Sequence, residues 1–96
     1  MTLQELKYLV ALADHGHFGK AAEACFITQS TLSTQIKKLE DFLGVTLFDR
    51  SLKRVTPTPI GQEILQAARS IVEESERIRE LAKHAQDPMA RTIHLG

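Results

Sequence analysis

The chain has 96 residues, the length of one small domain or of one domain with an appendage. Its 43% apolar content can form a core, but no apolar run reaches the roughly 20 residues that span a membrane, and the amino terminus lacks a secretory signal. Twelve basic and twelve acidic residues cancel, whereas nucleic-acid-binding proteins usually carry a basic surplus. The single cysteine excludes an internal disulfide and favours a cytoplasmic setting without a membrane partner.

Two short helices are predicted in the first 25 residues. Thr2 and Glu5 have the spacing of a capping box, so the first helix begins at once, and Gly16 ends it. Gly19 is the expected N-cap of the second helix. The small residues of that helix, which permit a close helix crossing, are Ala21, Ala22 and Cys25.

A third helix is predicted between a cap at Thr28 and a stop at Gly44. One face carries a helically spaced apolar stripe made of Leu32, Ile36, Leu39 and Leu43. The opposite face carries side chains that hydrogen-bond to base edges and phosphates, namely Ser30, Ser33, Thr34 and Lys37. One face fixed to a core and one polar face free to enter the major groove is the pattern of a DNA-recognition helix.

Residues 45–56 predict a short two-stranded hairpin with Lys53 and Arg54 near its tip. A basic hairpin beside a helix-turn-helix is typical of a wing that touches the DNA backbone or minor groove. The alternative is a solvated turn that only closes the core. The charge distribution agrees with the wing, since residues 28–58 hold five basic and three acidic residues, whereas residues 59–96 hold five and six.

A long helix is predicted from Pro59 to about Gln86, with Thr58 as N-cap and Asp87-Pro88 as its stop. Its length of about 42 Å exceeds what a small core needs. Isoleucines recur every seven residues with small residues beside them, which indicates a partner helix. The expected homodimer interface consists of Ile64, Ala68, Ile71, Ser75, Ile78 and Ala82. The alternative is one amphipathic helix packed only on its own domain.

The chain is thus expected to be mainly α, with three helices and a two-stranded wing followed by a long dimerisation helix. We expect a winged helix-turn-helix over residues 1–58, a linker helix over 59–87, and a hinge with the start of a further domain over 88–96. The last segment has strand composition from Thr92 to Leu95, so we expect the natural protein to continue past Gly96.

An ordered set of residues across the chain resembles the DNA-binding region of LysR-type transcriptional regulators. The similarity is strongest in the peroxide-responsive branch of that family, and it includes the linker helix. The matching residues are Ala21, Ala22, Thr28, Gln29, Ser30, Thr31, Leu32, Ser33, Gln35, Ile36, Leu39, Glu40, Leu43, Gly44, Leu47, Phe48, Arg50, Thr56, Thr58 and Gly61.

The resemblance implies a sequence-specific regulator that binds an interrupted inverted repeat in double-stranded DNA as a homodimer or tetramer, with RNA polymerase as a further candidate partner. It implies that the linker helices pair antiparallel and that Thr58 holds a phosphate. The residues implied to face bases and phosphates are Thr28, Gln29, Ser30, Thr31, Ser33, Thr34 and Lys37, with Arg50, Lys53 and Arg54 in the wing. Ser30 and Thr34 stand where many members have proline and arginine, so the operator cannot be copied from a relative.

Other functions have weaker support. Cys25 is expected to be a small buried hydrophobe rather than a redox sensor, and it does not combine with His15 and His17 at zinc-site spacing. No nucleophile–base set and no phosphate loop is present, so neither catalysis nor a cofactor is expected. A protein–protein assembly module, or a LysR-type regulator that answers a small molecule instead of peroxide, remains an alternative.

Overall fold

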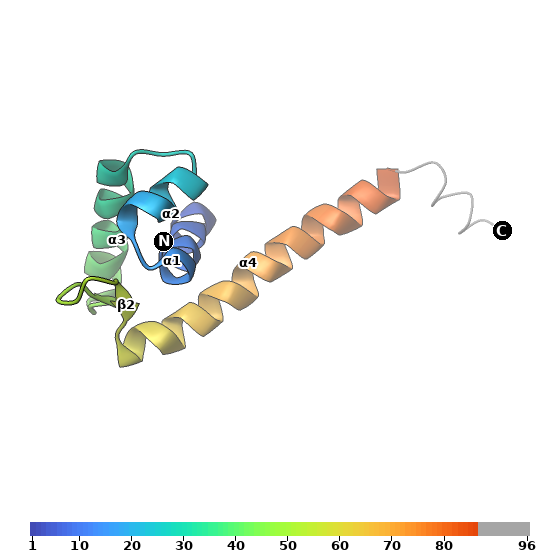
Figure 1. The fold of residues 1–96 in the computed structure, drawn as a ribbon. Coiled ribbons are helices and arrows are strands. Elements are labelled where there is room, and N and C mark those ends of the chain that lie inside the picture. Colours follow the sequence, from blue (N-terminus) through green and yellow to red (C-terminus); the bar gives the residue numbers. More distant parts are fainter. Residues whose placement is uncertain (87–96) are drawn as a thin grey trace.

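The computed structural model describes residues 1–86 as a helical domain from which one long helix extends (Figure 1). The elements in chain order are α1 (Leu3–His15), α2 (Phe18–Ala24), α3 (Gln29–Leu43), β1 (Phe48–Asp49), β2 (Thr56–Pro57) and α4 (Pro59–Gln86). This arrangement confirms the predicted fold class, with three helices, a two-stranded wing and a long fourth helix. The predicted stop at Asp87-Pro88, and the hinge and strand over residues 88–96, lie outside the described residues.

The core forms where α1, α2 and α3 meet the entrance to the wing. Its largest fully buried side chains are Leu9, Leu12, Leu32, Ile36, Leu39 and Leu47. Each buried aliphatic side chain of this size stabilises the fold by about 1.5–3 kcal/mol relative to an exposed one. Three members of the predicted apolar stripe of α3 belong to this set, and the fourth, Leu43, is half-buried against it. The inward face of α3 is therefore fixed to the core.

The predicted caps of α1 and α3 are present. The Oγ1 atoms of Thr2 and Thr28 each accept a hydrogen bond from the backbone N–H three residues later, at 3.1 Å. Both helices end at a glycine in the left-handed region, Gly16 with φ 72° and Gly44 with φ 73°. Such a φ favours glycine because it has no Cβ to clash with the backbone.

The predicted start of α2 is wrong by two residues. The helix begins at Phe18, and the extended His17 takes the N-cap position without a side-chain hydrogen bond. The left-handed Gly16 reverses the chain directly before His17, so the new helix starts earlier than Gly19. Phe18 then packs against the core.

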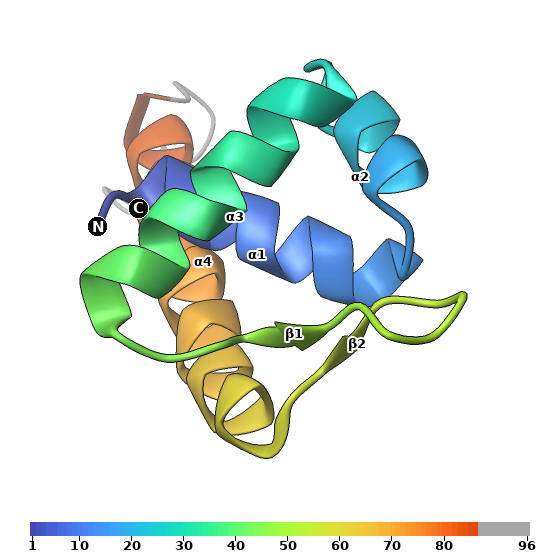
Figure 2. The ribbon, with the colours of Figure 1, turned by 90° about the vertical axis from the view of Figure 1, so that its left-hand side faces the viewer.

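The wing is shorter than the sequence pattern indicates. Its antiparallel strands pair only Phe48 with Pro57 and Asp49 with Thr56, while the Val55 N–H donates to the Gly16 carbonyl at 2.8 Å. Figure 2 shows the hairpin beside the carboxyl end of α1. Backbone groups that could lengthen the ladder are therefore bonded to other parts of the domain.

The two halves of α4 have different surroundings. In the first half, Leu65 and Ala68 are buried, and the helix is tied to α1 by an ion pair of 2.6 Å between Arg69 and Asp14. In the second half, Ile78 and Leu81 are 67% and 59% exposed. Figure 1 shows this half projecting away from the domain. Within residues 1–86, no helix is long and apolar enough to cross a membrane.

Candidate nucleic-acid interface

The amino end of α3 presents a group of exposed hydroxyls. Thr28 Oγ1 caps the helix and also lies 2.8 Å from Thr31 Oγ1 and 3.2 Å from Ser30 Oγ. Gln29 is exposed beside them. Hydroxyls and free N–H groups at the positive end of a helix dipole favour a negatively charged ligand such as a DNA phosphate.

The outward face of α3 continues this polar surface. Ser33, Thr34 and Lys37 are all exposed. Within residues 1–86, the Ser33 and Thr34 side chains make no hydrogen bond, and Lys37 pairs with Asp41. The seven predicted reading residues, Thr28 at the cap and six in α3, are therefore all exposed, with hydrogen-bonding capacity left for a ligand.

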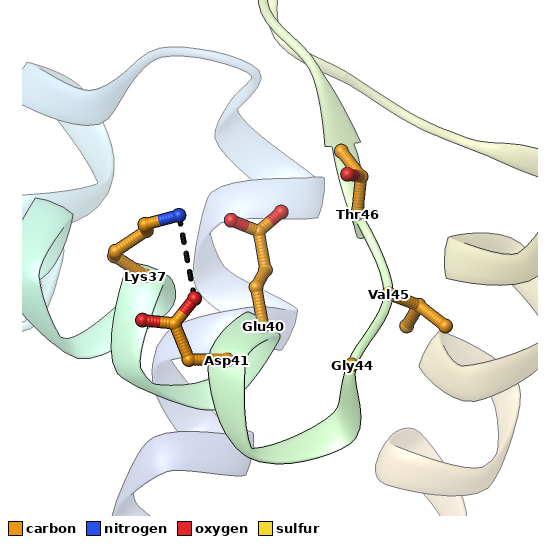
Figure 3. Close-up of a pocket in the computed structure, with 6 residues that line it drawn as sticks. All are labelled: Lys37, Glu40, Asp41, Gly44, Val45 and Thr46. Atoms are coloured by element: carbon orange, nitrogen blue, oxygen red, sulfur yellow. Dashed lines mark ion pairs between the residues drawn. The ribbon is translucent and has the colours of Figure 1, made fainter.

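Glu40 connects α3 to the wing, a role that the sequence analysis missed. Its carboxylate is 8% exposed and accepts hydrogen bonds from the backbone N–H groups of Leu47 at 2.7 Å and Phe48 at 3.4 Å. Its other oxygen accepts from the Arg50 guanidinium at 3.3 Å. Figure 3 shows Glu40 beside the segment that leads from Gly44 through Thr46 into the wing. A buried carboxylate with these partners fixes the angle between the recognition helix and the wing.

The three predicted basic residues of the wing have different surroundings. The Arg50 guanidinium lies 5.1 Å from the centre of the Phe18 ring as well as against Glu40. The Arg54 side chain covers Gly16, where an added Cβ would stand 2.7 Å from its Nε and Cζ atoms. Only Lys53 is exposed with no partner among the described residues. Two of the three cations are therefore engaged by their own domain.

Thr58 joins the wing to α4 through its hydroxyl. Thr58 Oγ1 donates to the Thr46 carbonyl at 2.7 Å and accepts from the Gly61 N–H at 3.0 Å. A Cβ on Gly61 would collide with the Leu47 carbonyl oxygen, so the first turn of α4 lies directly on the wing entrance. A phosphate contact through the Thr58 hydroxyl would require it to release the Thr46 carbonyl, so that predicted role stays a proposal.

The predicted dimer interface needs one correction. Ala68 is 1% exposed because it is packed into the core of its own domain, and Ile64 is half-buried against the same core. Ala68 is therefore not available to a partner helix. Farther along α4, an open apolar groove is lined by Leu3, Ser70, Ile71, Glu74, Ser75 and Ile78. Ile71, Ser75, Ile78 and Ala82 keep some exposure, and Leu3 joins them from α1.

Residues 3–62 match the model of the bacterial regulatory helix-turn-helix proteins of the lysR family. The chain belongs to this family. It is 42% identical over all 96 residues to the DNA-binding transcriptional dual regulator OxyR of Escherichia coli K12, of which it covers 32%. It is 41% identical over 95 residues, 99% of its own length, to a probable hydrogen peroxide-inducible genes activator of Mycobacterium xenopi, of which it covers 50%.

Solved structures of LysR-family proteins have the same fold. Full-length OxyR from Pseudomonas aeruginosa superposes with a TM-score of 0.85 at 49% identity, over 91% of this chain and 30% of that one. The DNA-binding domain of BenM in complex with its benA site also gives a TM-score of 0.85, at 33% identity, over 92% of this chain and 99% of that one. The chain is thus a LysR-family DNA-binding domain, and it spans about a third of the length of the OxyR proteins that it matches.

Cys25 differs from its predicted place in this LysR-family domain. It follows the last residue of α2 and is half-buried, so it is not a core residue. Burial raises the pKa of its thiol, which favours the unreactive protonated form. Within residues 1–86 no three histidine, cysteine or acidic side chains are grouped to hold a metal ion.

Proposed function

We propose that the chain reads operator DNA for a cytoplasmic, peroxide-responsive regulator of the OxyR type, and that it does so as a dimer without catalysing a reaction. The observation that carries the proposal is the outward face of α3, where the exposed Ser30, Ser33, Thr34 and Lys37 stand opposite three fully buried aliphatic residues. A helix held in this way can enter the major groove without losing its own packing.

The side chains of this face differ in what they can recognise. Gln29 can form two hydrogen bonds with the N6 and N7 atoms of adenine. Ser33 and Thr34 can donate to or accept from several base edges, and the Thr34 methyl group can contact the methyl group of thymine. Lys37 and Lys53 supply positive charge for phosphates, which orient the domain without reading sequence.

The second part of the proposal is a homodimer formed through the distal half of α4. The projecting helix carries an open apolar groove that its own domain does not cover. The same helix of a second copy can cover this groove. Antiparallel pairing would set the spacing of two reading heads on an interrupted inverted repeat. A tetramer would belong to the full-length protein.

Replacing Ile78 by aspartate tests the dimer. A charge in the apolar groove should give monomers, and binding to two half-sites should fall by about 10²- to 10⁴-fold because the two heads are no longer linked. Gln66→Asp is the matched control, since it adds the same charge to an exposed position outside the groove. Sedimentation that still showed Ile78→Asp dimers would exclude this interface.

The peroxide response is supported by the identity with OxyR of Escherichia coli and with hydrogen peroxide-inducible genes activators of other bacteria, which extends over the whole chain. A small-molecule effector is the second candidate, because the similarity is not confined to peroxide regulators: the HTH-type transcriptional regulator EstR of Acinetobacter baylyi is also 37% identical over 95 residues. Transcription of target promoters by the full-length protein, with and without hydrogen peroxide, distinguishes the two. Transcription that is the same with and without hydrogen peroxide would contradict the assignment to the OxyR type.

RNA polymerase is the protein partner that we propose beside DNA. Phe26, in the turn between α2 and α3, is 95% exposed and has the unfavourable positive φ of 59°. A large exposed aromatic side chain fits a protein contact better than a phosphate. An assembly module without DNA is less well supported, since Ser30, Ser33, Thr34 and Lys37 on the outward face of α3 are all polar.

Selection of bound sequences from a random DNA pool, followed by a salt titration, tests the main proposal. We expect a short half-site to be enriched as an inverted repeat, with log K falling linearly with log salt. Gln29→Ala should relax the preference at one base pair, whereas Gln66→Ala, the same change on α4, should leave the selected sequence unchanged. A pool without enrichment would contradict sequence reading.

A further inference from the structure

An ion pair lies on the surface of α3 that we propose as the reading face. The Lys37 Nζ atom is 3.3 Å from the Asp41 Oδ1 atom, and the two side chains are 67% and 65% exposed. Ser30, Thr34, Lys37 and Asp41 follow one another at steps of four, three and four residues. This spacing places all four on one face of a helix. Asp41 therefore brings a negative charge to the same face as the reading residues.

The two neighbouring carboxylates at this end of α3 have different partners. Glu40 is buried and its oxygens are occupied by Leu47, Phe48 and Arg50. Among the described residues, Asp41 has Lys37 as its only partner. Figure 3 shows the Asp41 carboxylate joined to the Lys37 ammonium, on the other side of Glu40 from Thr46. Among the described residues, Lys37 thus forms its ion pair with one carboxylate, and that carboxylate is accessible to solvent.

The Lys37–Asp41 pair adds little to the stability of α3. Exposed ion pairs at this spacing are weak, and the order lysine before acid is the less favourable one. Asp41 also lies in the last turn of α3, and this last turn, which ends at Leu43, contains no basic residue. A carboxylate is disfavoured there by the helix dipole. Folding therefore gives no reason for an aspartate at this position.

We propose that Asp41 competes with DNA phosphates for Lys37 and thereby lowers the affinity of the domain for DNA of any sequence. The proposal rests on the reading role of α3 stated above. Lys37 is the only cation among the seven predicted reading residues, and Lys38 is the only other cation of α3, so the pairing engages one of the two positive charges of this helix. Each phosphate contact releases condensed counterions, and a lysine held by a carboxylate contributes less to that release. Asp41 would then restrain non-specific binding in a chain that already has zero net charge.

Asp41→Asn tests the competition, because it removes the charge and keeps the size of the side chain. Binding of the 96-residue chain to the selected duplex and to a random duplex is measured over a range of salt concentrations. We expect affinity to rise by the same factor on both duplexes, about 3- to 10-fold at low salt, with the slope of log K against log salt steeper by about 1. In a Lys37→Ala background the same substitution should leave the slope unchanged.

Glu80→Gln is the matched control, since it removes one exposed negative charge from the distal half of α4. An equal gain from Glu80→Gln would overturn the proposal in favour of a net-charge effect. A loss confined to the selected duplex would overturn it by making Asp41 a base-reading residue. An unchanged slope in Asp41→Asn would also overturn it. Absence of sequence preference in the unsubstituted chain would instead contradict the reading role itself.

Discussion

The recognition helix and the wing were both predicted to meet DNA, yet they differ in how much of their chemistry is left for a ligand. On α3, the exposed Ser33 and Thr34 side chains have no partner among residues 1–86. In the wing, Arg50 is held by Glu40 and Phe18, and Arg54 covers Gly16. A polar helix face opposite a buried stripe must face the solvent, so its side chains are accessible to a ligand. A basic residue in a hairpin can instead form contacts within its own domain.

This difference suggests a division of labour. The outward face of α3 has hydrogen-bonding groups for base edges. Among the three wing cations in residues 1–86, Lys53 is the one that neither pairs with a carboxylate nor packs over Gly16. Arg50 and Arg54 hold the hairpin to α2 and α1 by their contacts, so they would act on DNA by fixing the position of Lys53. Substitutions in the two regions should therefore change different measured quantities.

Glu40→Ala should give the largest effect on the wing. The substitution leaves the Leu47 and Phe48 N–H groups without their acceptor and leaves Arg50 without its carboxylate. Loss of a buried, charge-assisted set of this kind costs about 3–5 kcal/mol of unfolding free energy. Urea unfolding at one fixed protein concentration measures it, because dimerisation would otherwise shift the midpoint.

Glu40→Gln is the control for that experiment, since its amide oxygen can still accept from one backbone N–H. We expect it to lose less stability than Glu40→Ala. Equal stability of Glu40→Ala and the unsubstituted chain would mean that Glu40 does not hold the wing, and the division between helix and wing would lose its structural basis.

Gln29→Ala should give the next largest effect, on binding instead of folding. Loss of a bidentate base contact should weaken binding to the selected duplex by about 1–3 kcal/mol and leave binding to a random duplex nearly unchanged. Thr34→Ala should behave in the same way with a smaller loss. Titration of both duplexes with the same protein preparation measures the difference. Equal losses of affinity for the two duplexes would indicate that Gln29 contacts a phosphate and does not read a base.

Much of the fold follows from local sequence signals. The capping hydroxyls of Thr2 and Thr28, the glycines after α1 and α3, and the apolar spacing of α3 each act within a few residues, so the sequence analysis located both helices correctly. The start of α2 was missed because it depends on how Gly16 turns the chain. The role of Glu40 was missed because its partners are seven to ten residues away and meet it only in the folded wing.

The dimer surface shows another limit of sequence patterns. Ile78 belongs to a row of isoleucines along α4 and Ala68 to the small residues that flank it, and this pattern does not reveal where the domain ends. Packing against α1 buries Ala68 and leaves Ile78 67% exposed.

Lys53→Ala should give the smallest change in DNA affinity, and it should distinguish the role of the wing from that of α3 most clearly. Removal of one phosphate-contacting cation should reduce the slope of log K against log salt by about 1 and weaken binding to all duplexes alike. The selected sequence should not change, because a phosphate contact carries no base preference. Lys83→Ala, an exposed lysine on the distal half of α4, is the matched control and should leave the slope unchanged.

The same titration on Arg54→Ala completes the comparison of the wing cations. Arg54 covers Gly16, so its loss should loosen the hairpin, lower the unfolding midpoint in urea and reduce affinity through the position of Lys53. In the double variant with Lys53→Ala, the loss of Arg54 should then have little further effect on the salt slope. Two additive reductions of the slope would show that Arg54 contacts a phosphate directly, and that the wing offers two cations to DNA.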